Sequence, residues 1–201
     1  MTQVLSKPLT FEEFLEWYPD DGSRYELIEG KIVAMRPVGQ QELVASFIDA
    51  EVTLEIRRLQ LPYFSSRNTL VKPHRTGSAD WLDVIVLDRE ALGADPYWEQ
   101  FSTISVGSSA RLVVEVVSTN WQDDYLRKLA DYETLGIPED WFVDYLGLGA
   151  TRYIGKPKQP TISVYQFVEG EYQFSQFRGA EPVMSPMFPD FALTAARVFQ
   201  A

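Results

Sequence analysis

A run of six residues, 112–117, limits the folds open to this chain more than any other feature of its sequence. Five of the six side chains are apolar, and the sixth is Glu115. A continuous apolar run of this length is typical of a strand that is covered on both faces. Such a strand lies inside a sheet with structure packed on each side, so the run predicts an α/β protein with a carboxylate in its interior.

Three stretches have the spacing and the end signals of helices. Thr10 and Glu13 form a capping box for a short helix that ends before Pro19. Apolar residues recur at helical spacing between residues 41 and 59, and Pro62 follows. Residues 118–120 can cap a third helix, which runs to about Leu135 and is ended by residues 136–138.

The other segments have the patterns of strands. Residues 25–28 and 31–35 alternate around Glu29-Gly30 and predict a hairpin. Further strands are expected at residues 63–71, 82–87 and 141–146, and hairpin strands in the C-terminal part at residues 151–154, 161–168 and 172–177. Without a repeat or a linker, this order predicts one α/β domain over residues 1–201. Its expected architecture is a mixed central sheet flanked by helices, with C-terminal β-hairpins.

Composition excludes several classes of protein. The chain has 201 residues, which is a usual length for one domain, and it has no cysteine. It therefore has no disulfide, thiolate zinc site, iron–sulfur cluster or cysteine nucleophile. Residues 1–8 lack the apolar run of a secretory signal, and no segment approaches the roughly 18 apolar residues of a membrane helix. We expect a soluble cytoplasmic protein without a membrane partner.

Two acidic residues occupy positions that otherwise belong to the core. Asp83 lies in the expected strand 82–87, and Glu115 interrupts the run 112–117. Burial of an unpaired carboxylate costs several kcal/mol, so each of the two needs a partner. That partner can be a structural ion pair or a backbone amide, or it can be a group bound in an active site.

The third helix carries a lysine on its inward stripe. The stripe recurs at spacings of 4, 3, 4 and 3 residues and consists of Trp121, Tyr125, Lys128, Tyr132 and Leu135. The ammonium can extend along the neighbouring rings toward solvent, or it can pair with Asp124. Because this helix folds back against the sheet directly after Glu115, Lys128 can instead face the strand ends that carry Asp83 and Glu115.

Two carboxylates and a lysine are suited to metal-assisted hydrolysis of a phosphodiester. Carboxylate oxygens hold Mg²⁺ while the ion keeps several waters and accepts phosphate oxygens. The ion polarises the phosphoryl group and lowers the pKa of a bound water. The lysine would orient the nucleophile or neutralise charge that develops in the transition state.

These residues lie in motifs that follow one another in a familiar order. The motifs are Tyr25-Glu26-Leu27-Ile28-Glu29-Gly30, Asp83-Val84, Val114-Glu115-Val116-Val117-Ser118, Asp124-x-x-x-Lys128-x-x-x-Tyr132 and Gly136-Ile137-Pro138-Glu139-x-Trp141-x-Val143-Asp144. Together they resemble the Uma-two family of restriction endonucleases, within the PD-(D/E)xK nuclease superfamily. The resemblance extends from about Thr10 to Phe188-Pro189 and so covers most of the chain.

The resemblance carries implications for fold, chemistry and partners. It implies a restriction-endonuclease-like fold, DNA as the substrate, and Mg²⁺ or Mn²⁺ as the cofactor. It further implies that Asp83 and Glu115 are metal ligands, that Lys128 is the catalytic lysine, and that Glu26 adds a carboxylate to the catalytic site. Nucleases of this fold class commonly dimerise to cut two strands, so a homodimer is expected from the resemblance.

The chain departs from the family pattern at three positions. Leu82 precedes Asp83, where the superfamily has a proline. Val117 stands two residues after the glutamate, where a lysine is expected, so Lys128 of the following helix has to take that role. Gln41 stands where family members often carry a histidine, which puts catalytic activity in question.

Other features with functional associations are interpreted without a catalytic role. His74 is the single histidine, so the chain offers neither a His-rich metal site nor a Ser–His–Asp triad. Gly147 and Gly149 suit a hairpin turn rather than a phosphate loop. The alternating aromatic residues of the C-terminal strands are expected to pack, with base stacking as the alternative: Tyr165, Phe167, Tyr172, Phe174 and Phe177.

The charge distribution bears on the binding of nucleic acid. With 18 Lys+Arg against 29 Asp+Glu, the formal net charge is −11, which on average repels polyanions. The segment 57–75 carries five basic residues and no acidic one, and a second basic cluster consists of Arg152, Lys156 and Lys158. The first segment is either a solvated helix end and loop or a local basic surface for DNA.

Two hypotheses of function remain open. The first is a metal-dependent nuclease that uses Asp83 and Glu115 as metal ligands. The second is a catalytically inactive module on the same fold, which binds nucleic acid or protein and keeps its acids as structural pairs. The ordered motifs favour the first hypothesis, whereas Gln41, Val117 and the acidic charge favour the second.

Overall fold

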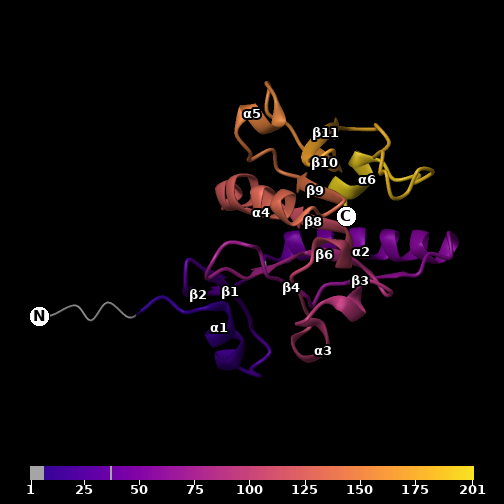
Figure 1. Ribbon diagram of the computed structural model, residues 1–201. Coiled ribbons are helices and arrows are strands. Elements are labelled where there is room, and N and C mark those ends of the chain that lie inside the picture. The colour runs from indigo at the N-terminus through magenta and orange to yellow at the C-terminus, as the bar shows by residue number, and fades with distance from the viewer. Residues whose placement is uncertain (1–6, 37) are drawn as a thin grey trace, which may run out of the picture.

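The computed structural model describes residues 7–36 and 38–201 and has a central sheet of six strands in the order β11-β10-β9-β8-β6-β3 (Figure 1). These strands are β3 (Tyr63–Ser66), β6 (Val84–Asp88), β8 (Ala110–Val116), β9 (Glu139–Asp144), β10 (Thr161–Val168) and β11 (Glu171–Phe177). Within this sheet β8 and β9 run parallel, and each other neighbouring pair is antiparallel. This architecture confirms the predicted α/β class with a mixed central sheet.

Strand β8 lies in the interior of this sheet and is covered on both faces, as its apolar run predicts. On one face Val114 and Val116 pack in a cluster with the helix α2 (Gly39–Arg58). On the other face Val113 packs with Tyr132 of the helix α4 (Leu129–Leu135). Because side chains alternate along a strand, Glu115 faces the α4 side.

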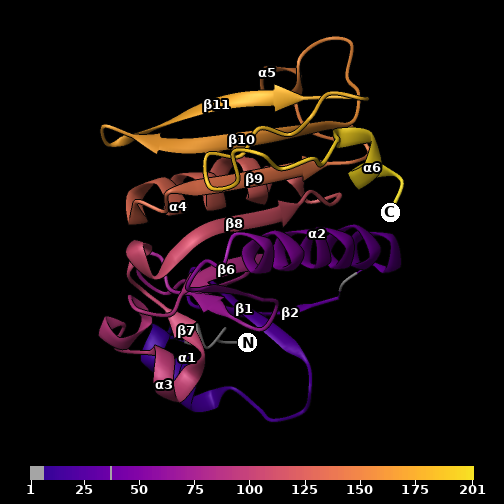
Figure 2. The same cartoon turned by 90° about the vertical axis from the view of Figure 1, so that its right-hand side faces the viewer.

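Helix α2 covers one face of the sheet along most of its own length (Figure 2). Its buried apolar residues include Val44, Ile48, Val52 and Ile56, which recur at helical spacing and pack against β6, β8 and β9. The last helix, α6 (Ala195–Phe199), lies on the same face. The predicted helix over residues 41–59 is therefore confirmed, with its start at Gly39.

The helix that follows β8 begins as a π-helix, Asp123–Lys128, and continues as α4. π-helical turns are rare and occur frequently at functional sites. The helix ends at Gly136, which has a φ of 71° and so takes the left-handed conformation that glycine tolerates best. The helix itself was predicted, whereas its π-helical first half was not.

The N-terminal part of the described chain forms a separate layer beside the central sheet. Its short helix α1 (Phe11–Trp17) has the predicted capping box: the Glu13 amide donates to Thr10 Oγ1 at 3.1 Å, and the Thr10 amide donates to Glu13 Oε2 at 2.8 Å. The predicted hairpin consists of β1 (Arg24–Ile28) and β2 (Lys31–Met35). Beside it lies a small sheet of β4 (Leu70–Val71), β5 (Asp80–Trp81) and β7 (Thr103–Ile104). A bridge between Leu27 and Ala79 joins the hairpin to the β5 segment.

The strands predicted at residues 63–71 and 82–87 have different bounds in the structure. The expected strand 63–71 is divided between β3 and β4, because the chain turns at Ser66, whose Oγ accepts the Asn68 amide at 3.1 Å. Strand β6 begins at Val84, so Asp83 precedes the strand that it was expected to open.

The C-terminal part contains one hairpin, β10–β11, because residues 151–154 are helical. This short helix is α5 (Thr151–Ile154), in which the Tyr153 and Ile154 amides donate to the Ala150 carbonyl at 2.8 and 3.2 Å. Residues 98–101 form a further helix, α3 (Trp98–Phe101), that the sequence pattern did not indicate. Within the described part of the chain, no helix is long and apolar enough to cross a membrane.

Candidate active site

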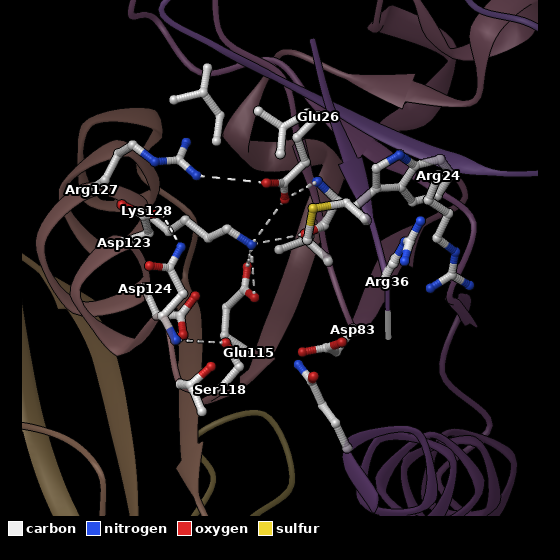
Figure 3. A pocket seen from close by; sticks show the side chains of 18 of the residues that line it. Arg24, Glu26, Arg36, Asp83, Glu115, Ser118, Asp123, Asp124, Arg127 and Lys128 are labelled. Atoms are coloured by element: carbon white, nitrogen blue, oxygen red, sulfur yellow. Dashed lines mark hydrogen bonds and ion pairs between the residues drawn. The ribbon is translucent and has the colours of Figure 1, made fainter. Parts of the chain in front are cut away.

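A cleft of about 230 Å³ opens where the hairpin β1–β2, the end of β8 and the π-helix meet (Figure 3). Strand β6 is antiparallel to β8, so the residue just before β6 lies beside the end of β8. The cleft is lined by all four residues that the sequence singled out, which are Glu26, Asp83, Glu115 and Lys128. The fold thus brings them together from four segments, of which only β8 and the helix after it are neighbours in the sequence.

Glu115 is buried and is held from the helix side by two groups. Both of its carboxylate oxygens lie 3.1 Å from Lys128 Nζ, and Tyr132 Oη donates to Oε1 at 2.6 Å. Burial raises the pKa of Glu115 well above its usual value, although the Lys128 charge acts in the opposite direction. The carboxylate of Glu115 is therefore a group that a second cation would stabilise further.

Lys128 is buried at the centre of a set of oxygens. Besides Glu115, its Nζ donates to the Trp81 carbonyl at 3.1 Å and lies 3.3 Å from Glu26 Oε1. Burial by itself lowers the pKa of Lys128, but Glu115 and Glu26 outweigh this effect and raise the pKa well above its usual value. Lys128 therefore remains an ammonium ion and does not act as a proton acceptor in this arrangement.

Glu26 comes from strand β1, on the far wall of the cleft. Its Oε1 also accepts the Trp81 amide at 3.1 Å, and its Oε2 lies 3.9 Å from an Arg127 nitrogen. Only 3% of Glu26 is exposed, so this carboxylate is fixed in place by Lys128, Arg127 and the Trp81 backbone. Its position links the hairpin β1–β2 to the helix that carries Lys128.

Asp83 lines the same cleft but bonds to the backbone of β8 rather than to Lys128. Its Oδ2 accepts the Val116 amide at 2.7 Å, at the end of β8. Burial raises the pKa of Asp83, while the Val116 amide and the Lys128 charge act to lower it. In Figure 3 its carboxylate points into the space beside Glu115.

Asp124, Arg127 and Tyr132 also belong to this site, although the sequence reasoning gave them no role there. Arg127 forms an ion pair with the buried Asp80. Asp124 precedes Lys128 by one turn and lines the cleft. The spacing Asp124-x-x-x-Lys128-x-x-x-Tyr132 was the available signal for Asp124 and Tyr132, since it places them one turn before and one turn after Lys128 on one helix. No such signal pointed to Arg127.

The structure gives physical reasons for two of the departures from the family pattern. Val117 is fully buried against Tyr125 and Phe142, so this position has an apolar environment. Gln41 Nε2 donates to the Val116 carbonyl at 2.8 Å and so joins the start of α2 to the end of β8. Gln41 lines the cleft as well.

The basic segment 57–75 does not gather into one surface for DNA. Three of its arginines are paired with acids, in the ion pairs Arg58–Glu55, Arg67–Glu42 and Arg75–Asp131. Lys72 lies over the rings of Phe11 and Tyr97. The arginines that line the cleft are Arg24, Arg36 and Arg127, and these come from other segments.

The remaining features are placed away from this chemistry. His74 is exposed and lies outside the cleft lining. The segment 147–149 is a turn after β9, in which the Leu148 and Gly149 amides donate to the Asp144 carboxylate at 2.8 and 2.7 Å. It connects β9 to helix α5 rather than forming the predicted hairpin turn.

The donor set of the cleft agrees in chemistry with a hard divalent cation. Asp83, Glu115 and Asp124 present carboxylate oxygens, which such ions prefer, and Asp124 Oδ2 is buried without a hydrogen-bond partner among the described residues. In residues 7–36 and 38–201, however, no three acidic or histidine side chains are gathered closely enough to form a ready-made metal cluster. At Glu115 the position of a metal ion is taken by Lys128, whose ammonium lies against both oxygens of that carboxylate.

A mixed sheet with carboxylates at the ends of two central strands, facing a buried lysine on the helix after β8, gives this α/β protein a nuclease-like site. The Uma2 family model, described as "Putative restriction endonuclease", matches residues 11–196, and the chain belongs to this family. No curated protein sequence matches the chain.

A solved structure with the same fold comes from Anabaena variabilis ATCC 29413 and is described as a putative nuclease belonging to DUF820. It superimposes with a TM-score of 0.71 and 17% sequence identity, over 96% of this chain and 98% of that chain. At this level of identity the likeness establishes the fold. It confirms that the chain has the architecture expected from the resemblance.

Proposed function

We propose that the protein is a divalent-metal-dependent nuclease that hydrolyses phosphodiester bonds in DNA. The observation that carries this proposal is the convergence of Glu26, Asp83, Glu115 and Lys128 on one cleft. Membership of a family described as restriction endonucleases supports the same reaction and the same substrate. The proposed cofactor is Mg²⁺ or Mn²⁺, held by Asp83 and Glu115.

A bound divalent cation would polarise the phosphoryl group and lower the pKa of a water molecule. The residues of the chain have separate tasks. Lys128 holds Glu115 and Glu26 in position and supplies a fixed positive charge for the phosphate, and Tyr132 fixes the Glu115 carboxylate from the other side. The arginines Arg24 and Arg36 at the cleft attract the DNA backbone.

Two further parts of the proposal concern assembly and location. We propose that the protein acts as a homodimer, because a second active site allows both strands of a duplex to be cut. We also propose that it acts in the cytoplasm. Sedimentation velocity of the full chain measures the first of these, with and without duplex DNA.

Cleavage assays with three variants test the nuclease proposal. Plasmid DNA and labelled single-stranded, duplex and RNA oligonucleotides are incubated with the full chain in Mg²⁺, in Mn²⁺ and in EDTA. We expect metal-dependent DNA cleavage that falls at least a hundredfold in Asp83→Asn and in Glu115→Gln. Glu51→Gln is the matched control, because Glu51 lies on α2 and pairs with Arg197 at 3.1 Å, outside the cleft. Undiminished cleavage by carefully purified Asp83→Asn and Glu115→Gln would contradict the assignment.

One observation favours the alternative of a catalytically inactive binding module on the same fold. Lys128 contacts both oxygens of Glu115, as expected if the acids are retained as structural pairs. On this alternative the full chain binds no Mn²⁺ in calorimetry, and any DNA binding is the same in Mg²⁺ and in EDTA. A divalent site that is lost in Asp83→Asn counts against it.

A further inference from the structure

Asp124 is a buried carboxylate whose second oxygen has no partner. The residue is 9% exposed, it lines the cleft, and Oδ2 has no hydrogen-bond partner among the described residues. A buried acceptor without a partner destabilises the folded protein, and more so when it is charged. Native proteins retain such a group mainly where it serves a ligand, a water or a reaction.

The position of Asp124 in its helix does not account for the carboxylate. An acid in the first turn of a helix interacts favourably with the helix dipole, but the preceding residue, Asp123, already supplies one. Asp123 is half-buried and is hydrogen-bonded to Asn120. Asp123 therefore meets the need at this helix end. The Asp124 carboxylate accepts a hydrogen bond from the Ser118 backbone, and its Oδ2 is left without a partner among the described residues.

The surroundings of Asp124 point to a cation. Lys128 is engaged by Glu115 and Glu26, so its donors are directed at these two carboxylates and at the Trp81 carbonyl. Figure 3 shows Asp124 and Asp83 on either side of Glu115. Three carboxylates in one small cleft repel one another unless positive charge beyond that of Lys128 is added between them.

We propose that Asp124 is a third carboxylate of the divalent-cation site, where it acts with Glu115 and Asp83. This inference rests on the proposed metal-dependent function and extends its ligand set. Mg²⁺ and Mn²⁺ commonly bind through one or two carboxylates and keep several waters, so Asp124 can reach the ion directly or through one of these waters.

Metal titration of matched variants provides the test. Mn²⁺ binding by the full chain is measured by calorimetry for the native protein and for Asp124→Asn, Asp190→Asn and Asp83→Asn. The Asn side chain keeps the size of Asp and removes only the charge, and Asp190→Asn makes the same change at an exposed residue outside the cleft. We expect the dissociation constant to rise at least tenfold in Asp124→Asn and to change less than twofold in Asp190→Asn.

A second measurement uses the native sequence and so does not depend on the folding of a variant. Substoichiometric Mn²⁺ should broaden the amide resonances of residues 123–125 together with that of Glu115, because the paramagnetic ion acts on nearby nuclei. If the native protein and Asp124→Asn bind Mn²⁺ equally well, the role of Asp124 is overturned and the metal-dependent function is not. If the native protein binds no Mn²⁺, both this inference and the metal-dependent function are overturned. Loss of binding in Asp124→Asn, with broadening at residues 123–125, supports the assignment.

Discussion

Replacement of Lys128 by methionine removes a positive charge that lies directly between two buried carboxylates of the cleft. Methionine has a similar length and fills most of the same volume, so the main change is the loss of the ammonium. Two carboxylates, Glu115 and Glu26, then lose a neighbour that lies 3.1 and 3.3 Å away. Each of these carboxylates is 3% exposed, so water does not take the place of the ammonium.

The size of the effect follows from this burial. Removal of one partner from a buried ion pair destabilises a protein by about 3–5 kcal/mol, because the remaining charge is left uncompensated. For a chain of this length each kcal/mol lowers the melting temperature by about 2–4 °C, so Lys128→Met should melt about 6–20 °C below the native protein. Tyr132 and the Trp81 amide still bond to the two carboxylates, which places the effect within this range rather than above it.

Urea and thermal unfolding in EDTA measure the change without any contribution from metal. Lys7→Met is the matched control, because Lys7 pairs with Glu13 at 3.6 Å and its side chain is 79% exposed. Exposed pairs contribute about 0–1 kcal/mol, so this variant should be nearly as stable as the native protein.

The pH dependence gives a second check on the same ion pair. Burial already raises the pKa of Glu115, and loss of Lys128 raises that pKa further. The folded variant then binds protons more tightly than its unfolded chain, so its stability falls as the pH rises through neutrality. The deficit of Lys128→Met relative to the native protein should therefore be largest at neutral and alkaline pH and should shrink in acid. A deficit below 1 kcal/mol at pH 8 would refute the reasoning.

Two further predictions concern the acids around Lys128. The pKa of Asp124 is raised from 3.8 to about 6, chiefly by burial, so the native protein should lose up to about 3 kcal/mol of stability as the pH rises from about 4 to above 6. Asp124→Asn should abolish this loss. In urea unfolding in EDTA, the free energy of unfolding of the variant should equal that of the native protein near pH 4 and exceed it at pH 8. Lys128→Met should bind Mn²⁺ more tightly than the native protein, because the Lys128 ammonium of the native protein competes with the ion for Glu115, and the variant should cleave no DNA. Calorimetry that shows equal or weaker Mn²⁺ binding by the variant contradicts this competition.

The elements whose signals are local in the sequence were predictable. The capping box at Thr10, the helical spacing of α2 and the apolar run of β8 each depend on neighbouring residues, and each is confirmed. The proximity of Lys128 to Glu115 was predictable for the same reason, since one helix follows one strand directly. The alternation of β8 and the stripe of the helix then direct the two side chains toward each other.

The parts of the site that join distant segments were not predictable from spacing. The resemblance offered Glu26 as an additional carboxylate, but its 3.3 Å contact with Lys128 depends on how the hairpin β1–β2 docks beside β5. The pairing of Arg127 with Asp80 depends on the same docking. The π-helical turn has no local signal either, because its side chains would also suit an α-helix.

The basic segment 57–75 shows why a count of charges along the sequence does not predict a surface. Its arginines looked unopposed because no acid lies within the segment. Their partners are Glu42, Glu55 and Asp131, which come from α2 and α4. Basic and acidic residues that lie apart in the sequence form ion pairs in the fold, so this segment contributes little positive potential.

The same reasoning changes the meaning of the net charge of −11. Nine of the 29 acidic residues are buried, whereas Lys128 is the one buried residue among the 18 basic ones, and residues 1–6 and 37 carry no charged side chain. The remaining, more accessible residues are 20 acidic and 17 basic, a net charge of −3. The buried residues, nine acids and one lysine, therefore account for −8 of the net charge of −11. Burial also raises the pKa of Glu115, Asp140 and Glu139.

A surface of net charge −3 repels a polyanion far less than the formal total of −11 implies. The cleft can then attract DNA through the few arginines that line it, of which Arg36 directly follows β2 and Arg24, at the start of β1, lies 3.8 Å from Glu42. Binding through so few phosphate contacts is weak and sensitive to salt. The excess of acids over basic residues is thus largely buried, and the acids of the cleft lie where a divalent cation would offset their charge.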